Sequence, residues 1–174
     1  MRTVDWEQRV GEAWASFDDR DAAEFLTLIE KLVEELPPGD PDGLFERAAA
    51  LDSTGHSDLA VPLYESALAA GVSGERRRRA VIQMASSLRN LDRSQESVAL
   101  LTAELQEPPD HLDDAVRTVL ALALTDVGRE REAVSIAVGA LAAHLPRYQR
   151  SMAAYARALV EPDPAADPEA DVRS

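Results

Sequence analysis

The sequence predicts an all-α protein built from repeated helical hairpins, and three observations support this prediction. Hydrophobic residues make up 45% of the 174 residues and aromatic residues only 5%, so the apolar content is mainly Ala, Leu and Val. Ala and Leu are strong helix formers. The ten prolines cluster between periodic segments or near the carboxyl terminus, where they would end helices. Three similar turns also recur at nearly constant intervals, which is typical of a helical repeat protein.

The three turns align at Gly55, Asp92 and Gly128, which are 37 and then 36 residues apart. Glycine or a short polar residue is expected there, because one residue must leave the helical backbone. Five residues later each repeat has a small side chain that would let its two helices approach closely: Ala60, Ser97 and Ala133. Four residues further on are the side chains expected to fill the space between neighbouring hairpins: Tyr64, Leu101 and Ala137.

These signals predict one domain over residues 1–160. Its expected parts are a degenerate leading hairpin over 1–40 with helices at 4–17 and 21–36, repeats over 41–74, 75–110 and 111–145, and a capping helix over 146–160. Tyr148, Met152, Tyr155 and Leu159 have helical spacing in that cap. Residues 161–174 are expected to form a disordered acidic tail. The alternative is a plain helical bundle with long connections, which the constant repeat spacing disfavours.

Charge and composition exclude several classes of partner. The formal net charge is -14, whereas nucleic acids and anionic membranes attract basic surfaces. No stretch approaches the 18 or so apolar residues of a membrane span, and the amino terminus lacks the apolar run of a signal peptide. The chain is therefore expected in the cytoplasm. Because it contains no cysteine, it has no disulfide, thiolate nucleophile or Cys-based zinc site.

The residue patterns that would carry catalysis are missing from the sequence. His56, His111 and His144 lie at predicted helix boundaries, and no two of them have the i, i+4 spacing of a helical metal site. The glycines form no phosphate-binding pattern. We therefore predict no catalytic, cofactor-binding or metal-binding residues, and no enzyme.

The arginine run over residues 76–79 has two interpretations. It could bind an anion or an acidic partner. Alternatively, it is the solvated first turn of a helix that faces the acidic amino-terminal half of this same chain. Such charge pairs contribute little when they are exposed.

The repeats resemble the tetratricopeptide (TPR) family in the order of glycine, small residue, aromatic residue and Ala-Leu. The best copy consists of Gly55, Ala60, Tyr64, Ala67 and Leu68, and the next consists of Gly128, Ala133, Ala140 and Leu141. Several stretches also resemble a compact group of TPR proteins found largely in actinomycetes. The resemblance covers about residues 41–160. It implies a right-handed α-α superhelix of about four hairpins with a carboxyl-terminal capping helix, and binding of another protein rather than a reaction.

A partner-binding face is predicted on the helix over residues 75–91. Val81, Met84, Ala85 and Leu88 form its buried stripe, because they cluster when 100° is allowed per residue. The predicted binding residues lie opposite this stripe or at its edge: Arg79, Gln83, Ser86, Arg89 and Asn90. Their guanidinium, amide and hydroxyl groups suit the carboxylates and backbone of an extended peptide.

The neighbouring helices are expected to extend this groove. Phe45, Ala49 and Asp52 would line it on one side, and Thr118, Leu122 and Asp126 on the other. The Lys, Asn and Arg set by which chaperone-binding TPR domains hold a carboxylate is not reproduced, so no free carboxyl-terminal peptide is predicted as the ligand.

The predicted function is a protein–protein interaction scaffold that binds a protein or peptide segment in this groove, as a monomer or weak homodimer. One alternative is a structural protein that self-associates through its acidic amino-terminal half or its cap. Another is a small-molecule sensor or enzyme, which would require an enclosed pocket with perturbed ionisable groups.

Overall fold

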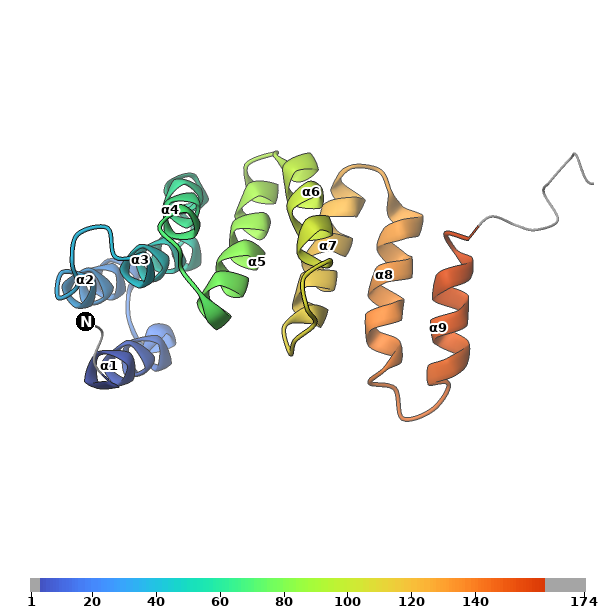
Figure 1. Ribbon diagram of the computed structural model, residues 1–174, viewed down its shortest axis with the longest axis horizontal. Helices are drawn as coiled ribbons and strands as arrows, with labels where there is room; N and C mark the ends of the chain where they lie inside the picture. The colour runs from blue at the N-terminus through green and yellow to red at the C-terminus, as the bar shows by residue number, and fades with distance from the viewer. Residues whose placement is uncertain (1–3, 162–174) are drawn as a thin grey trace, which may run out of the picture. The chain divides into compact units, whose positions relative to one another are not determined.

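The computed structural model describes residues 4–161, and this part of the chain is helical without any strand. The all-α prediction is therefore confirmed for the described residues, while residues 162–174 of the predicted tail lie outside them. The elements follow in this order (Figure 1): α1 (Val4–Ala15), the short 3-10 helix η1 (Phe17–Asp19), α2 (Ala22–Val33), α3 (Pro41–Ser53), α4 (Ser57–Ala69), α5 (Gly74–Asn90), α6 (Ser94–Glu104), α7 (Asp113–Asp126), α8 (Glu130–Ala142) and α9 (Gln149–Ala158).

The chain forms two compact units, the first ending at Leu100 and the second beginning at Leu101. The boundary falls within α6. In the first unit α3 pairs with α4, and α5 packs against both of these helices. In the second unit α7 pairs with α8, and α8 pairs with α9. The hairpin is thus the building element of both units.

The three predicted turns have the same backbone geometry. Gly55, Asp92 and Gly128 all have left-handed φ angles, of 88°, 59° and 76°. After each of them an N–H donates across the turn to a carbonyl of the preceding helix at 2.9 Å: His56 to Leu51, Arg93 to Leu88 and Arg129 to Leu124. Bonds of this kind satisfy carbonyl groups that a helix end leaves without partners. The three aligned turns therefore share one backbone geometry.

Alanine at Gly55 or at Gly128 is expected to lower the free energy of unfolding by about 1–2 kcal/mol. An added Cβ would meet no atom within 4 Å at either position, so the loss comes from the left-handed backbone alone. Gly11 lies inside α1 and is equally open, so Gly11→Ala should instead raise stability by about 0.5–1 kcal/mol. Urea unfolding followed by far-UV circular dichroism measures all three, and equal losses at Gly11 and Gly55 would contradict the explanation.

The leading helices α1 and α2 pack through large aromatic side chains. The rings of Trp14 and Phe25 are 4.9 Å apart between centroids in an edge-on arrangement, which is a favourable geometry for aromatic pairs. The indole N–H of Trp6 donates to the carbonyl oxygen of Leu32 at 2.8 Å, so this buried polar atom has a partner. Both helices end before the predicted boundaries at residues 17 and 36, because η1 and the turn after Val33 interrupt the helical backbone.

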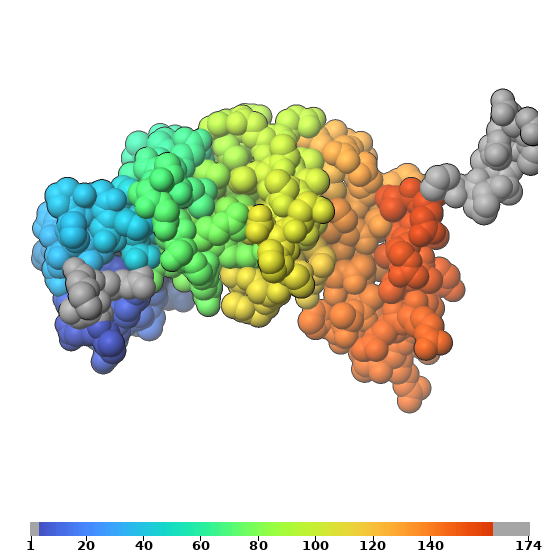
Figure 2. Space-filling view, in the orientation of Figure 1, coloured from blue at the N-terminus to red at the C-terminus, as the bar shows by residue number. Residues whose placement is uncertain are grey.

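The cap differs from the sequence prediction in the residues that it buries. α9 packs on α8, and the surfaces of these two helices, orange and red, lie side by side (Figure 2). The Ser135 hydroxyl donates to the carbonyl of Ala156 at 2.7 Å. Ala156 is buried, whereas Tyr148 and Tyr155 are 73% and 64% exposed. The packed face of α9 therefore includes Ala156 and excludes both tyrosines, so the apolar spacing that includes them does not mark it.

Candidate functional site

The helix α5, which carries the predicted binding residues, is seated in the cleft between α3 and α4. Ala80, Met84 and Leu88 of α5 are buried in one cluster with Phe45 and Tyr64 of the hairpin. This stripe agrees with the predicted one at Met84 and Leu88. The predicted polar residues of α5 therefore lie at the edges of the face that packs on the α3–α4 hairpin.

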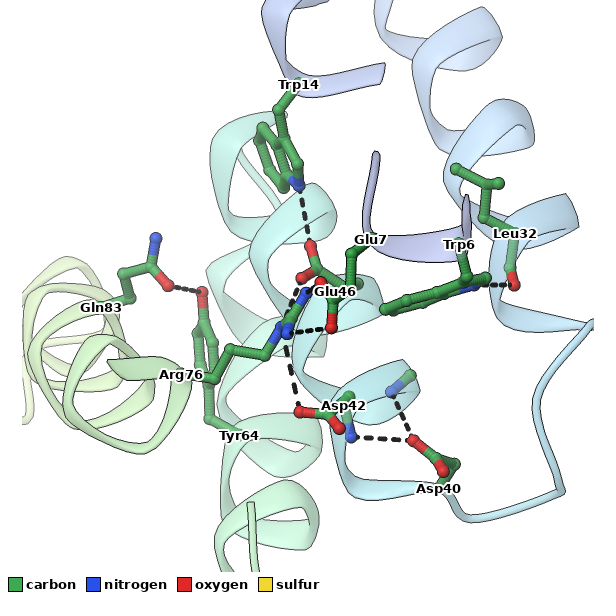
Figure 3. Close-up of polar contacts among 11 residues, drawn as sticks. Trp6, Glu7, Trp14, Leu32, Asp40, Asp42, Glu46, Tyr64, Arg76 and Gln83 are labelled. Carbon is green, nitrogen blue, oxygen red and sulfur yellow. Dashed lines mark hydrogen bonds and ion pairs between the residues drawn. The ribbon is translucent and has the colours of Figure 1, made fainter. Parts of the chain in front are cut away.

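The predicted binding residues Arg79 and Gln83 contact the hairpin beneath α5. The Arg79 guanidinium carbon lies 5.2 Å from the ring centroid of Phe45, a cation–π distance. The Tyr64 hydroxyl lies 3.3 Å from the Oε1 atom of Gln83, to which it donates (Figure 3). Both side chains are half-buried. These two residues hold α5 in place within the first unit.

The other predicted residues of α5 lie nearer its carboxyl end. Asn90 is exposed, and its Nδ2 atom donates to the hydroxyl of Ser57 at 3.2 Å. Ser86 and Arg89 are half-buried. The structure therefore brings three of the five predicted residues against the α3–α4 hairpin. Binding of a partner by this face stays a prediction.

The residues expected beside that face divide between the two units. Phe45 and Ala49 are completely buried, so the expectation that they line an open groove is wrong. The reason is that their side of α3 is the one that α5 covers. By contrast, Thr118, Leu122 and Asp126 of α7 are exposed in the second unit.

The arginine run begins with a charge network inside the first unit. Arg76 donates to the carboxylate of Glu7 at 3.0 and 2.7 Å and to Glu46 at 2.8 Å, and it lies 3.9 Å from Asp42 (Figure 3). Burial alone would lower the pKa of the Arg76 guanidinium, but the hydrogen bonds to these carboxylates outweigh burial and raise the pKa. Arg76 therefore faces the acidic half of this chain, as the second interpretation predicts, but its side chain is largely buried rather than solvated.

Glu46 connects this network to α1 from a buried position on α3. Only 2% of Glu46 is exposed. Its Oε2 atom accepts a hydrogen bond from the indole of Trp14 at 2.7 Å, while Oε1 accepts from Arg76 (Figure 3). Both carboxylate oxygens thus have partners on other helices, as a buried charge requires. The network joins α1, α3 and α5 and gives three of the acidic residues in this part of the chain a structural role.

A second polar cluster surrounds Asp52 at the other end of α3. The Ser87 hydroxyl donates to Asp52 at 2.6 Å, and the Tyr64 hydroxyl lies 3.4 Å from the same carboxylate. Burial raises the pKa of the Asp52 carboxyl above its ordinary value, although these two hydrogen bonds act in the opposite direction. Asp52 therefore titrates at a higher pH in the folded chain than in the unfolded chain.

This shift gives Asp52 a pH-dependent effect on stability. Where the folded pKa is the higher one, the native chain binds more protons than the unfolded chain, so stability falls as pH rises. The free energy of unfolding of the natural chain should therefore fall, relative to that of Asp52→Asn, as pH rises above about 4. Urea titrations at several pH values measure this difference. If the natural chain instead gained stability relative to Asp52→Asn as pH rises, the hydrogen bonds to Asp52 would outweigh its burial.

The second unit contains an open groove on the α7–α8 hairpin, with a volume of about 440 Å³. Its walls are mainly apolar, and large parts of its leucine and valine side chains are exposed: 48% of Leu122, 49% of Val134 and 56% of Leu141. Asp114 and His144 lie at one end, and small residues form the rest of the lining: Thr118, Ala121, Thr125, Ala133, Ala137 and Ala140. We call this surface the α7–α8 groove.

The same surface is covered in the first unit. Alignment of Gly55 with Gly128 matches Ala49 to Leu122 and Val61 to Val134. Ala49 is 0% exposed and Val61 is 2% exposed, because α5 packs over this side of the α3–α4 hairpin. Among the helices of the second unit, α9 packs on α8 and makes no comparable contact with α7. The position that α5 occupies on the first hairpin is therefore left open on the α7–α8 hairpin.

Charged side chains lie at one end of the α7–α8 groove. His144 Nε2 is 2.8 Å from Asp114, and Arg117 donates to the same carboxylate at 3.0 Å. These hydrogen bonds, from His144 first and then Arg117, hold the pKa of the Asp114 carboxyl below its ordinary value. The groove thus has an apolar floor and a polar edge, a combination common in protein-binding surfaces.

Sequence reasoning found one wall of the α7–α8 groove and missed the other. Thr118 and Leu122 were expected beside a binding face, but Val134 and Leu141 of α8 were not. The available signal was Ala137, which replaces Tyr64 at the position that should fill the space between hairpins. A small residue there indicates that the third repeat does not fill this space itself.

Helical hairpins with a shared turn geometry, together with an open apolar face, define an α-helical repeat protein. A sequence model of the family described as Tetratrico peptide repeat matches residues 41–159, and the chain belongs to this family. Proteins of this family are typically non-enzymatic scaffolds that bind proteins or peptides. No curated protein and no solved structure matches the chain.

Two further observations concern residues 4–161. None of the helices in this range is both long enough and apolar enough to span a membrane. The same range holds no group of three or more His, Asp or Glu side chains arranged to bind a metal ion.

Proposed function

We propose that this chain is an interaction scaffold that holds a segment of another protein in the α7–α8 groove. One observation carries the proposal: Leu122 and Val134 are half-exposed, whereas their counterparts in the first unit are buried beneath a helix. Exposed apolar side chains that are gathered in one groove and rimmed by polar groups often mark a binding surface. Burial of these side chains by a partner would stabilise a complex by about 1.5–3 kcal/mol for each fully covered residue.

The experiment places a photo-reactive amino acid at the groove in the full chain. A photo-crosslinker at Leu122 or Val134, expressed in the native cells, should form adducts with another protein. The matched control position is Leu59, which is 53% exposed on α4 in the first unit. Adducts formed equally from Leu59 and Val134, or from neither position, would overturn the proposal.

The polar face of α5 is a second proposed surface for the same function. Exposure of Asn90 and partial exposure of Ser86 support it. Ser86→Glu with Asn90→Glu changes this face without touching the second unit. Loss of the adducts at Val134 in that variant would assign partner binding to α5, while retention would assign it to the α7–α8 groove.

A further inference from the structure

We propose that the occupant of the α7–α8 groove is an amphipathic α-helix of a separate protein, bound in the way that α5 is bound to α3–α4. This inference rests on the proposed function. It adds that the bound helix carries bulky apolar side chains one turn apart and basic residues near its ends. The packing of α5 on the α3–α4 hairpin is the model for this complex.

Contacts of α5 define how a helix sits on this kind of hairpin. Arg79 lies over Phe45, Gln83 accepts from Tyr64, and Ser87 donates to Asp52. The counterparts of the three hairpin residues are Thr118, Ala137 and Thr125, and all three line the α7–α8 groove. The groove therefore coincides, position by position, with the seat of α5.

Differences between the two hairpins determine the side chains that would fit. Phe45 and Tyr64 are both completely buried and fill the seat of α5. Their replacement by Thr118 and Ala137 removes two aromatic rings, so the α7–α8 groove has more space than the seat of α5 at the positions that α5 meets with Arg79 and Gln83. A helix bound there must fill this space, because unfilled apolar space loses dispersion contacts. Leucine, methionine or phenylalanine at those two positions, four residues apart, would do so.

Charge favours a basic partner over a second copy of this chain. The α7–α8 hairpin carries five acidic and three basic side chains. Arg117 is paired with Asp114 on its own helix, and Arg129, which immediately precedes α8, is paired with Glu132. Glu130 lies one turn before Val134 on the same face of α8. The whole chain has a formal net charge of -14, so two copies would repel each other. Basic residues at the ends of a partner helix would be attracted by the net negative charge of this hairpin.

The probe is a synthetic, fluorescently labelled peptide of residues 74–91 carrying Arg79→Leu and Gln83→Leu, and the control is the same peptide unchanged. Fluorescence anisotropy with the full chain measures binding of both. Two buried leucines should make the modified peptide bind at least about tenfold more tightly. The chain's own α5 is tethered beside its hairpin, so a free peptide cannot compete for that seat.

Variants of the full chain locate the binding. Thr118→Phe with Ala137→Tyr restores the two rings of the first unit and should weaken binding of the modified peptide by at least about tenfold. Leu59→Glu is the control, because Leu59 lies in the first unit and is about as exposed as Leu122 of the groove. This variant should leave binding of the modified peptide unchanged. Far-UV circular dichroism verifies that both variants are folded.

The inference is overturned if the modified peptide binds no better than the unchanged one. It is also overturned if the variant with Thr118→Phe and Ala137→Tyr binds the modified peptide as tightly as the natural chain does. It is also overturned if light scattering shows dimers that Val134→Glu dissociates, because the occupant would then be a second copy. Cross-linking at Val134 distinguishes failure of the proposed function from failure of the inference that the occupant is a helix. Adducts without binding of the modified peptide would leave the proposed function intact and refute the helix, whereas missing adducts would refute the proposed function itself.

Discussion

Glu46→Ala is expected to lower the free energy of unfolding of the first unit by about 3–5 kcal/mol. The substitution removes the carboxylate that accepts from both Trp14 and Arg76 while leaving both partners in place. Arg76 would keep Glu7 and the more distant Asp42 but would lose its hydrogen bond to Glu46, and the Trp14 indole would lose its hydrogen-bond acceptor. The cost is large because charged and polar groups would remain partly buried with too few hydrogen bonds.

Tryptophan fluorescence measures this loss directly. The chain contains two tryptophans, Trp6 and Trp14, and both lie in the first unit, so urea unfolding followed by their emission reports on that unit. The matched control is Glu35→Ala, which removes an exposed carboxylate 2.6 Å from Arg9. This control should cost no more than about 1 kcal/mol. Similar losses for Glu46→Ala and Glu35→Ala would show that the buried network does not stabilise the unit.

Tyr64→Ala is expected to cost about 3–5 kcal/mol, the range for truncation of a large buried aromatic residue. Tyr64 is completely buried, and its ring centroid lies 6.3 Å from that of Phe45. Its removal would leave a cavity between α3, α4 and α5 and would leave Asp52 and Gln83 without the hydroxyl. The same urea experiment with tryptophan fluorescence measures the loss.

The reverse substitution at the equivalent position of the second unit provides the control. Ala137→Tyr adds a ring to an open groove, so stability should change by no more than about 0.5 kcal/mol. Far-UV circular dichroism measures this variant because the second unit contains no tryptophan. A large loss at Ala137 would mean that the α7–α8 groove is already packed, which would contradict the comparison of the two hairpins.

Local signals explain why the repeats could be predicted from the sequence. Gly55, Asp92 and Gly128 mark points where the backbone leaves the helix, and this depends on a few neighbouring residues. Spacing also predicted the buried stripe through Met84 and Leu88, because helical periodicity determines which residues share a face. Such features need no knowledge of distant parts of the chain.

Features that depend on packing between helices could not be predicted in this way. Arg79 and Gln83 lie at the edges of the stripe, and only the angle at which α5 meets α3 and α4 decides that they contact Phe45 and Tyr64. The α7–α8 groove depends on the place where α9 packs, and α9 follows α8 without covering α7. Periodicity identifies a face that can be buried, but it does not identify the element that buries it.

The open face of the α7–α8 hairpin also has a consequence for hydrogen exchange. The α3–α4 hairpin is covered by α5, whereas α7 and α8 have one packed neighbour fewer on the equivalent side. Amide hydrogens in elements with fewer buried contacts exchange through local openings of lower free energy. Backbone amides of α7 and α8 should therefore exchange with deuterium sooner than those of α3 and α4. A ligand seated on Leu122 and Val134 would slow the exchange, so its arrival could be recorded even before it is identified.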